Sequence, residues 1–224
     1  MNTYETTIIK HDMVDESTLF LHIAKPEGFS YEAGQFIMLE HEGVKRAYSL
    51  YSSPEEDHLQ LLIRIVTDGK LTGHLKEVRD ETPVHFTGPF GRFTLKDSPR
   101  KKIFVALGTG LAPLRPMIVH LQQTGFADEM QLFYSVRVAS QLAGNDEFVA
   151  LAETNANFHY YPCVTRDDTW QGYQGRVQGI LFEKLSDPAG HDYYLCGLTV
   201  AVKDITQQLL EKGVPKEQIF SESY

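Results

Sequence analysis

The sequence has few cysteines and no long apolar run, and both shortages exclude classes of protein. Its 224 residues include only Cys163 and Cys196, too few for a C-x-x-C pair, a cysteine zinc cage or a four-cysteine iron–sulfur site. No stretch approaches the roughly 20 apolar residues of a membrane-spanning helix. The first residues lack the basic start and apolar core of a signal peptide. We therefore expect a cytoplasmic protein without a membrane segment.

Positive charge is also scarce. The chain has 21 Lys and Arg against 30 Asp and Glu, a formal net charge of −9. Because a nucleic-acid backbone attracts a basic face, this balance argues against nucleic-acid binding. The nine histidines form no H-E-x-x-H or comparable set, so no metal site is predicted. We expect a monomer.

The first half of the chain is typical of an antiparallel β-barrel. Short alternating or β-branched runs are separated by turn-prone clusters such as "KPEG" and "SPEED". In "HLQLLIRIV" (58–66), Leu59, Leu61, Ile63 and Ile65 alternate with Gln60 and Arg64, as in a half-buried strand. One helix is predicted in "GKLTGHLKEV" (69–78). These features predict a small barrel with one helix.

The second half is typical of an α/β fold with a parallel sheet. Apolar strand runs ("KIFVAL", "MQLFYSV", "FHYYPCV", "DYYLC") alternate with helical patterns. Two helical faces are predicted, each closed by a glycine (Gly125 and Gly213); they consist of Leu114, Met117, Ile118 and Leu121, and of Leu198, Val202, Ile205 and Leu209. The boundary is predicted within "LKDSPRKK", giving domains 1–98 and 99–224.

A cation, an aromatic ring and a hydroxyl lie close together in "RAYSLYSSP" (46–54). On a strand, Arg46 and Tyr48 would share one face, and Ser49 would point away at the strand end. Arginine suits a phosphate, and tyrosine offers a flat ring with a polar tip. The three residues fit a ligand with a pyrophosphate and a planar ring, although they could equally be surface and barrel-edge residues.

Two further glycine-containing segments follow. "GKLTGHL" places Gly69 ahead of Thr72 at a helix start, where backbone N–H groups attract anions, but this pattern also suits a simple N-cap. "GPFGRF" (88–93) reads by itself as a turn. In this order, R-x-Y-S, G-x-x-[ST]-x-x-L and G-P-x-G-x-F resemble the flavin domain of the ferredoxin–NADP reductase superfamily, and "RAYS…SP" with "DGKLT" is especially similar to its bacterial members.

The resemblance implies an FAD site in the first domain. Arg46 would contact the FAD pyrophosphate, Tyr48 would pack by the isoalloxazine and ribitol, and Ser49 would lie near flavin N5. Gly69–Thr72 would lie at the flavin phosphates. The full predicted FAD set is Arg46, Tyr48, Ser49, Ile63, Gly69, Lys70, Leu71, Thr72 and Tyr224.

"FVALGTGLAPLRPMI" (104–118) predicts a strand, a Gly-Thr-Gly turn and a helix. Glycines let a backbone approach a phosphate, but a lone G-x-G turn is a weak signal, and Pro113 replaces the third glycine of the G-x-G-x-x-G pattern. G-T-G-x-A-P resembles the superfamily's nicotinamide-dinucleotide loop. The resemblance implies that Gly108, Thr109, Gly110 and Pro113 line that site.

Three arginines bear on the choice of dinucleotide. NAD sites usually carry an acid at the end of the second strand, where this chain has "YSVR" with Arg137. Arg166 follows the next strand and Arg176 follows in "QGR". Similarly placed arginines in bacterial ferredoxin–NADP reductases hold the 2′-phosphate, which implies NADP(H). The arginines could instead be ordinary surface residues, and Asp167 and Asp168 could neutralise Arg166.

The chain's last strand and its end complete the predicted site. Cys196-Gly197 closes a strand; a cysteine there is commonly a small buried hydrophobe, but the resemblance places its thiol beside the nicotinamide. "IFSESY" could be a disordered tail, although Ile219 and Phe220 make it a poor candidate for one. The resemblance implies that Glu222 and Tyr224 match an E-x-Y ending whose aromatic ring covers the flavin. Ser49, Cys196, Glu222 and Tyr224 form the predicted catalytic set.

The resemblance implies an FAD-dependent oxidoreductase that passes electrons between NADPH and a ferredoxin or flavodoxin. Three alternatives remain: an NAD(P)H:flavin reductase, the reductase component of an oxygenase, and a non-catalytic flavin-binding regulatory subunit. "SPRKK" (98–102) and Arg115 are either a basic docking patch for an acidic ferredoxin or, the interpretation we favour, a solvated linker.

Overall fold

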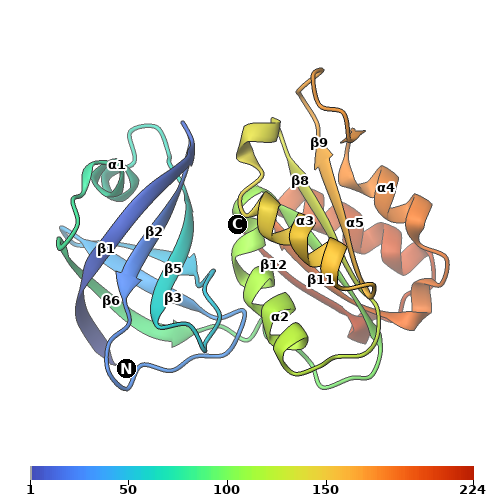
Figure 1. Cartoon of the computed structure of the whole chain (residues 1–224), viewed down its shortest axis with the longest axis horizontal. Coiled ribbons are helices and arrows are strands. Elements are labelled where there is room, and N and C mark those ends of the chain that lie inside the picture. The colour runs from blue at the N-terminus through green and yellow to red at the C-terminus, as the bar shows by residue number, and fades with distance from the viewer. Residues whose placement is uncertain (1) are drawn as a thin grey trace. The chain divides into compact units, whose positions relative to one another are not determined.

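A computed structural model describes residues 2–224, which form two compact units (Figure 1). The first unit contains the chain up to Leu95 together with Ala112–Thr124, and the second contains Lys96–Leu111 and Gly125–Tyr224. The division within the chain near Leu95 is close to the predicted domain limits 1–98 and 99–224, which we keep as a proposal. The helix 112–124 belongs by its contacts to the first unit.

The first unit is built on a six-stranded antiparallel sheet in the order β4-β3-β6-β1-β2-β5. A bridge between Leu50 and Leu61 joins the chain just after β4 to β5, so the sheet closes into a barrel. Leu59, Leu61 and Ile63 are buried in the barrel core as predicted, and Ile65 packs against it partly buried. Leu62 is buried as well, so the alternation is not strict. The elements are β1 (Thr3–Asp15), β2 (Thr18–Ala24), β3 (Phe36–His41), β4 (Val44–Ser49), β5 (His58–Arg64), α1 (Lys70–Glu77) and β6 (Pro83–Phe90).

The second unit is built on a six-stranded parallel sheet in the order β10-β9-β8-β7-β11-β12. The middle strands are almost entirely buried, which explains their unbroken apolar runs. Together the two sheets confirm the predicted fold class. The elements from β7 onward are β7 (Lys101–Leu107), α2 (Leu111–Gln123), β8 (Met130–Val136), α3 (Asn145–Thr154), β9 (Phe158–Val164), β10 (Tyr173–Gln174), α4 (Val177–Lys184), β11 (His191–Gly197), α5 (Thr199–Glu211) and β12 (Ile219–Ser223).

The predicted apolar face of α2 is fully buried, but the predicted face of α5 is only partly correct. Val202, Ile205 and Leu209 are buried, whereas Leu198 is 60% exposed. Leu198 was wrongly placed on the helix because α5 begins one residue later and Leu198 keeps a non-helical backbone at the N-cap. The last residues form strand β12 beside β11, so they are not a disordered tail.

Two cations of the docking hypothesis, Lys102 of "SPRKK" and Arg115, are largely buried. The side chains of Lys102 and Asp192 are each only 1% exposed, and Lys102 Nζ lies 3.0 Å from Asp192 Oδ2. Lys102 also donates to the backbone oxygens of Ser98 and Arg100. Arg115 is mostly buried and forms an ion pair with Glu56 at 2.7 Å. Arg100 and Lys101 also have acidic partners, Asp192 at 3.7 Å and Glu129 at 2.9 Å, so all four cations of the docking hypothesis are paired.

No helix within residues 2–224 is both long and apolar enough to cross a membrane. The same residues contain no group of three or more His, Cys, Asp and Glu side chains that could hold a metal ion.

Candidate functional site

Strand β4 carries the first predicted cofactor residues. It is the first strand in the order of the barrel sheet and pairs with β3. The Arg46 side chain is exposed, and its Nη1 donates to the Lys45 backbone oxygen at 2.8 Å. Tyr48 packs half-buried against the barrel core, and this burial raises the pKa of its hydroxyl to about 12. The hydroxyl therefore stays protonated and can donate a hydrogen bond. Ser49 is half-buried at the end of the strand.

The start of α1 has the features of an anion site. Gly69 is the N-cap and no side chain caps the helix, so the first backbone N–H groups, including those of Lys70 and Leu71, point out of the helix without intrahelical acceptors. Thr72 Oγ1 accepts from the Val66 N–H at 3.2 Å, which closes the preceding loop onto the helix. A Cβ on Gly69 would overlap Thr72 Oγ1 and lie 3.0 Å from the Val66 oxygen. Glycine at 69 is thus required for this close packing.

Three other predicted residues, all in the first unit, are buried. Ile63 is 0% exposed in the barrel core, so only its backbone could reach a ligand. The Leu71 side chain also belongs to that core. Pro113 is buried in the first turn of α2. These residues would act on a cofactor through the shape of the backbone around it.

A histidine pair fastens α1 to the barrel. The rings of His41 on β3 and His74 on α1 stack with centroids 3.6 Å apart and planes 9° apart. Burial, and then the neighbouring His41, lower the pKa of His74, and this effect exceeds the opposing influence of Glu42 and Glu77. Protonating His74 is therefore unfavourable in the folded barrel.

We expect α1 to loosen as the pH falls. Because the folded-state pKa of His74 lies below its ordinary value of 6.5, the unfolded chain binds the proton more readily, and stability is lost as the pH drops below that value. Between about pH 7.5 and 5.5, the amide protection of α1, measured by hydrogen exchange, should decrease more in the native protein than in His74→Phe. His85→Phe, at an exposed position of β6, is the control and should behave like the native protein. An equal decrease in all three proteins would contradict this role.

The predicted dinucleotide loop lies between β7 and α2, where Gly108–Gly110 form a short 3-10 turn. Gly108 has a φ of +58° with open space around it. Gly110 is packed so tightly that a Cβ would overlap the Cys196 backbone oxygen and lie 2.8 Å from the Gly197 Cα. Gly197 in turn has a φ of +137°, and its Cβ would lie 2.6 Å from the Leu107 Cβ. The ends of β7 and β11 therefore approach each other through glycines.

Cys196 lies on β11 between Ala106 of β7 and Glu222 of β12. Its side chain is 0% exposed, and burial, followed by the Glu222 charge, raises the pKa of the thiol above its usual range. The thiol stays protonated, so it can pack or donate weakly but is not a nucleophile.

The end of the chain is tied to the same loops. Tyr224 N–H donates to the Gly197 oxygen, and Thr199 N–H donates to the Tyr224 oxygen. The hydroxyls of Tyr224 and Thr109 are 2.7 Å apart. The Tyr224 side chain is 61% exposed. The second unit thus brings Thr109, Cys196, Gly197, Glu222 and Tyr224 together at the carboxyl ends of its strands; Ser49 belongs to the first unit.

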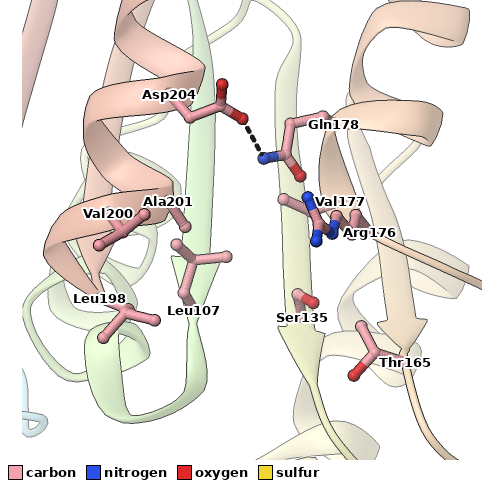
Figure 2. A pocket seen from close by; sticks show the side chains of 10 residues that line it. All are labelled: Leu107, Ser135, Thr165, Arg176, Val177, Gln178, Leu198, Val200, Ala201 and Asp204. Atoms are coloured by element: carbon pink, nitrogen blue, oxygen red, sulfur yellow. Dashed lines mark hydrogen bonds between the residues drawn. The ribbon is translucent and has the colours of Figure 1, made fainter.

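A pocket of about 500 Å³ opens at the same end of the sheet (Figure 2). Figure 2 shows Arg176 at the start of α4, above Ser135 and Thr165, with the start of α5 on the opposite side. Gln178 Nε2 donates to Asp204 Oδ2 across the pocket at 2.9 Å. The lining consists of Leu107, Ser135, Thr165, Arg176, Val177, Gln178, Leu198, Val200, Ala201 and Asp204.

The three predicted arginines follow successive elements around this end of the sheet. The Arg166 N–H donates to the Arg137 oxygen at 2.7 Å, so these two residues lie side by side just beyond β9 and β8. Arg176 is the N-cap of α4. All three side chains are exposed, and within residues 2–224 none of them forms an ion pair. Asp167 and Asp168 therefore do not neutralise Arg166 by direct pairing.

Sequence reasoning missed part of the pocket. Thr165, Gln178, Asp204 and Val200 line it but were not predicted as ligand residues. Thr165 had a usable signal, since it precedes Arg166 at the carboxyl end of a predicted strand. The pairing of Gln178 with Asp204 joins two helices that are far apart in sequence, and no local pattern indicates it.

Two domain families match the chain. Residues 5–95 match the family described as "Oxidoreductase FAD-binding domain", and residues 104–207 match "Oxidoreductase NAD-binding domain". The two matches leave only the ends and the segment 96–103 unmatched. The matched families correspond to the two predicted cofactor classes, FAD and a nicotinamide dinucleotide.

Individual curated proteins are similar to most of the chain. Protein RfbI of Salmonella typhimurium is 29% identical over 94% of this chain and 64% of its own length. The phenol 2-monooxygenase reductase component DmpP of a Pseudomonas species is 30% identical over 91% of this chain and 60% of its own length. The chain thus spans less than two thirds of these curated relatives.

Solved structures match over almost the entire chain. A ferredoxin NADP+ reductase from Neisseria gonorrhoeae, crystallised with FAD and NADP, superposes with a TM-score of 0.88 at 24% identity, covering 99% of this chain and 98% of that one. The Amycolatopsis cytochrome P450 reductase GcoB gives a TM-score of 0.92 at 24% identity, covering 99% of this chain and 70% of that one. By its two domain matches the chain belongs to the FAD- and NAD-binding oxidoreductases, and its fold is that of the ferredoxin reductase-like family.

Proposed function

We propose that the protein is a cytoplasmic, monomeric FAD-dependent reductase that takes electrons from NADPH and passes them to a ferredoxin or flavodoxin. The observation that carries the proposal is that three exposed arginines without ion-pair partners among residues 2–224 follow elements at the end of the parallel sheet, where Arg176 lines a pocket of about 500 Å³. A dianionic 2′-phosphate is the group such cations favour, since guanidinium and phosphate form charge-assisted hydrogen bonds.

The barrel would hold FAD. The uncapped start of α1 at Gly69–Thr72 offers N–H groups to a phosphate, and the exposed Arg46 offers a cation. The half-buried Tyr48 offers a ring face and a hydroxyl donor. Ser49 would lie near the flavin ring, where it could donate to N5. When bound, FAD supplies the chemistry, accepting a hydride at N5 and releasing electrons singly.

The second unit would hold NADPH. Gly108, Thr109 and Gly110 would bring the backbone close to the dinucleotide phosphates, and Arg137, Arg166 and Arg176 would bind the 2′-phosphate. The protonated Cys196 and Gly197 would leave room for the nicotinamide. Glu222 and Tyr224 would complete the transfer site, with the Tyr224 ring occupying the nicotinamide's place until NADPH arrives.

The reductase component of an oxygenase is the second candidate. It is favoured by the similarity to DmpP, the reductase component of a phenol 2-monooxygenase. The chain spans 60% of that relative's length. Reduction of a purified ferredoxin, flavodoxin or oxygenase component by the protein and NADPH distinguishes the two candidates.

We expect Arg176→Ala to raise the KM for NADPH about tenfold and to leave the KM for NADH within about twofold, because one charge-assisted contact contributes roughly 1.5–3 kcal/mol. The assay is ferricyanide reduction by the FAD-loaded protein. Arg79→Ala, an exposed cation in the first unit, is the control and should change neither constant.

The native protein provides the wider test. It should be yellow as purified or after FAD addition, and it should use NADPH in preference to NADH. A protein that binds no FAD, or that uses both dinucleotides equally well, contradicts the proposal. Bound FAD without ferricyanide reduction would instead favour a non-catalytic regulatory subunit.

A further inference from the structure

Two acids directly follow Arg166, and the structure gives them different roles. The Asp167 carboxylate accepts from the Ala139 N–H at 3.2 Å through Oδ2, and from the Thr169 N–H at 3.1 Å and hydroxyl at 2.6 Å through Oδ1. These hydrogen bonds lower the pKa of Asp167. Asp168 is exposed and makes no hydrogen bond or ion pair among residues 2–224.

The Asp167 carboxylate connects the two loops that carry the predicted phosphate-binding arginines. Arg166 directly precedes Asp167, and Arg137 stands two residues before Ala139. The loops already meet through the Arg166 N–H and the Arg137 oxygen, 2.7 Å apart. The Thr165 N–H also donates to the Val136 oxygen at 3.1 Å, so the loops are joined before and at Arg137. The bond from Ala139 to Asp167 joins them beyond Arg137, and the backbone of this arginine is therefore held on both sides.

Asp167 also shapes its own loop. Its bonds to Thr169 and the bond from the Trp170 N–H to the Asp167 oxygen, at 3.2 Å, fold residues 167–170 into a compact turn. The turn begins directly after Arg166. The backbone that carries this arginine is therefore held from the β8 side and from the turn.

We propose that Asp167 is a positioning residue for the 2′-phosphate of NADPH: it fixes the backbones of Arg137 and Arg166 so that both guanidinium groups can reach one phosphate. This inference rests on the proposed preference for NADPH. Two long side chains bind one anion tightly only if their anchors are already in place, because ordering them at the moment of binding weakens the affinity.

The opposite role makes the opposite prediction. If Asp167 acted mainly as a nearby negative charge, it would repel the phosphate, and its removal would strengthen NADPH binding. If it acts by positioning, its removal weakens binding although the site becomes more positive. Asp168 provides the comparison, because it carries the same charge one residue away without the hydrogen bonds.

The test measures the KM for NADPH and for NADH by ferricyanide reduction with the FAD-loaded full chain. We expect Asp167→Ala to raise the KM for NADPH about tenfold and to leave the KM for NADH and kcat within about twofold. Asp168→Ala should leave the KM for NADPH unchanged or lower it. Asp167→Asn keeps one acceptor oxygen and should give an intermediate KM for NADPH.

An unchanged or lowered KM for NADPH in Asp167→Ala overturns the inference, and so does an equal rise in both KM values. Far-UV circular dichroism checks that each variant is folded, and Asp167→Asn carries the test if the alanine variant is not. Arg166→Ala distinguishes a failure of this inference from a failure of the proposed function. If it raises the KM for NADPH while Asp167→Ala does not, only this inference fails; if native protein and Arg166→Ala treat both dinucleotides alike, the proposed function fails.

Discussion

Asp192→Asn should lower the free energy of unfolding of the second unit by about 3–5 kcal/mol, since it leaves a buried ammonium without its counter-charge. Lys102 and Asp192 are each 1% exposed and lie 3.0 Å apart at the start of β7 and β11. The backbone oxygens of Ser98 and Arg100 bind the same ammonium but carry no formal charge to neutralise it. The measurement is urea denaturation followed by the fluorescence of Trp170, the chain's single tryptophan, which belongs to the second unit.

Two matched variants locate the source of the effect. Lys102→Met with Asp192→Leu removes both charges and should restore most of the lost stability, because apolar groups need no partner. Lys101→Met breaks an exposed pair with Glu129 and should cost less than about 1 kcal/mol. If Asp192→Asn were as mild as Lys101→Met, the pair would not be important for stability.

Gly110→Ala should reduce kcat/KM for NADPH by about 100-fold or more, because a displacement of roughly 1 Å at a reacting site can have that effect. A Cβ at this position would overlap the Cys196 backbone oxygen, and neither backbone can yield without moving the end of β7 or of β11. Both Cys196 and Gly197 would shift from the positions in which they are proposed to face the nicotinamide. The assay is NADPH oxidation by the FAD-loaded protein, normalised to bound flavin.

Gly108→Ala is the matched control. Its φ of +58° disfavours alanine by about 1–2 kcal/mol, but the added methyl group would meet no atom within 4 Å. It should therefore lower stability slightly and kcat/KM much less than Gly110→Ala does. Equal losses in the two variants would assign the effect to loop conformation and refute the steric account.

Most of the architecture could be predicted because strands and helices each give a characteristic local spacing of apolar residues. The alternation of Leu59, Leu61 and Ile63 indicated a barrel strand, and the apolar stripe on α2 indicated a buried helix. Leu198 was misassigned because the helical spacing of apolar residues extends one position before the start of α5. Leu198 is the N-cap, with a non-helical backbone, so its side chain does not belong to the buried face.

Long-range partners could not be predicted. Lys102 looked like part of a solvated basic run because its partner, Asp192, is 90 residues away. Arg115 likewise pairs with Glu56, 59 residues earlier. Charge is visible in a sequence, but desolvation and pairing depend on which strands become neighbours.

In the candidate site, too, residues with a local sequence signal could be predicted and long-range partners could not. The glycine loop and the three arginines could be found because they follow strands whose carboxyl ends meet at one edge of the sheet. The structure added the reason Gly110 must be glycine, the pocket wall formed by Gln178 and Asp204, and the contacts of Asp167.

Both thiols of the chain, Cys163 and Cys196, are fully buried, and burial raises the pKa of Cys163 to about 12. Maleimide and iodoacetamide reagents require an accessible thiolate, so they should not react with the native protein. A cysteine engineered on the surface could accept a dye or spin label without prior removal of the natural pair. The rate at which the native thiols are slowly modified would then measure how often the α/β unit opens transiently.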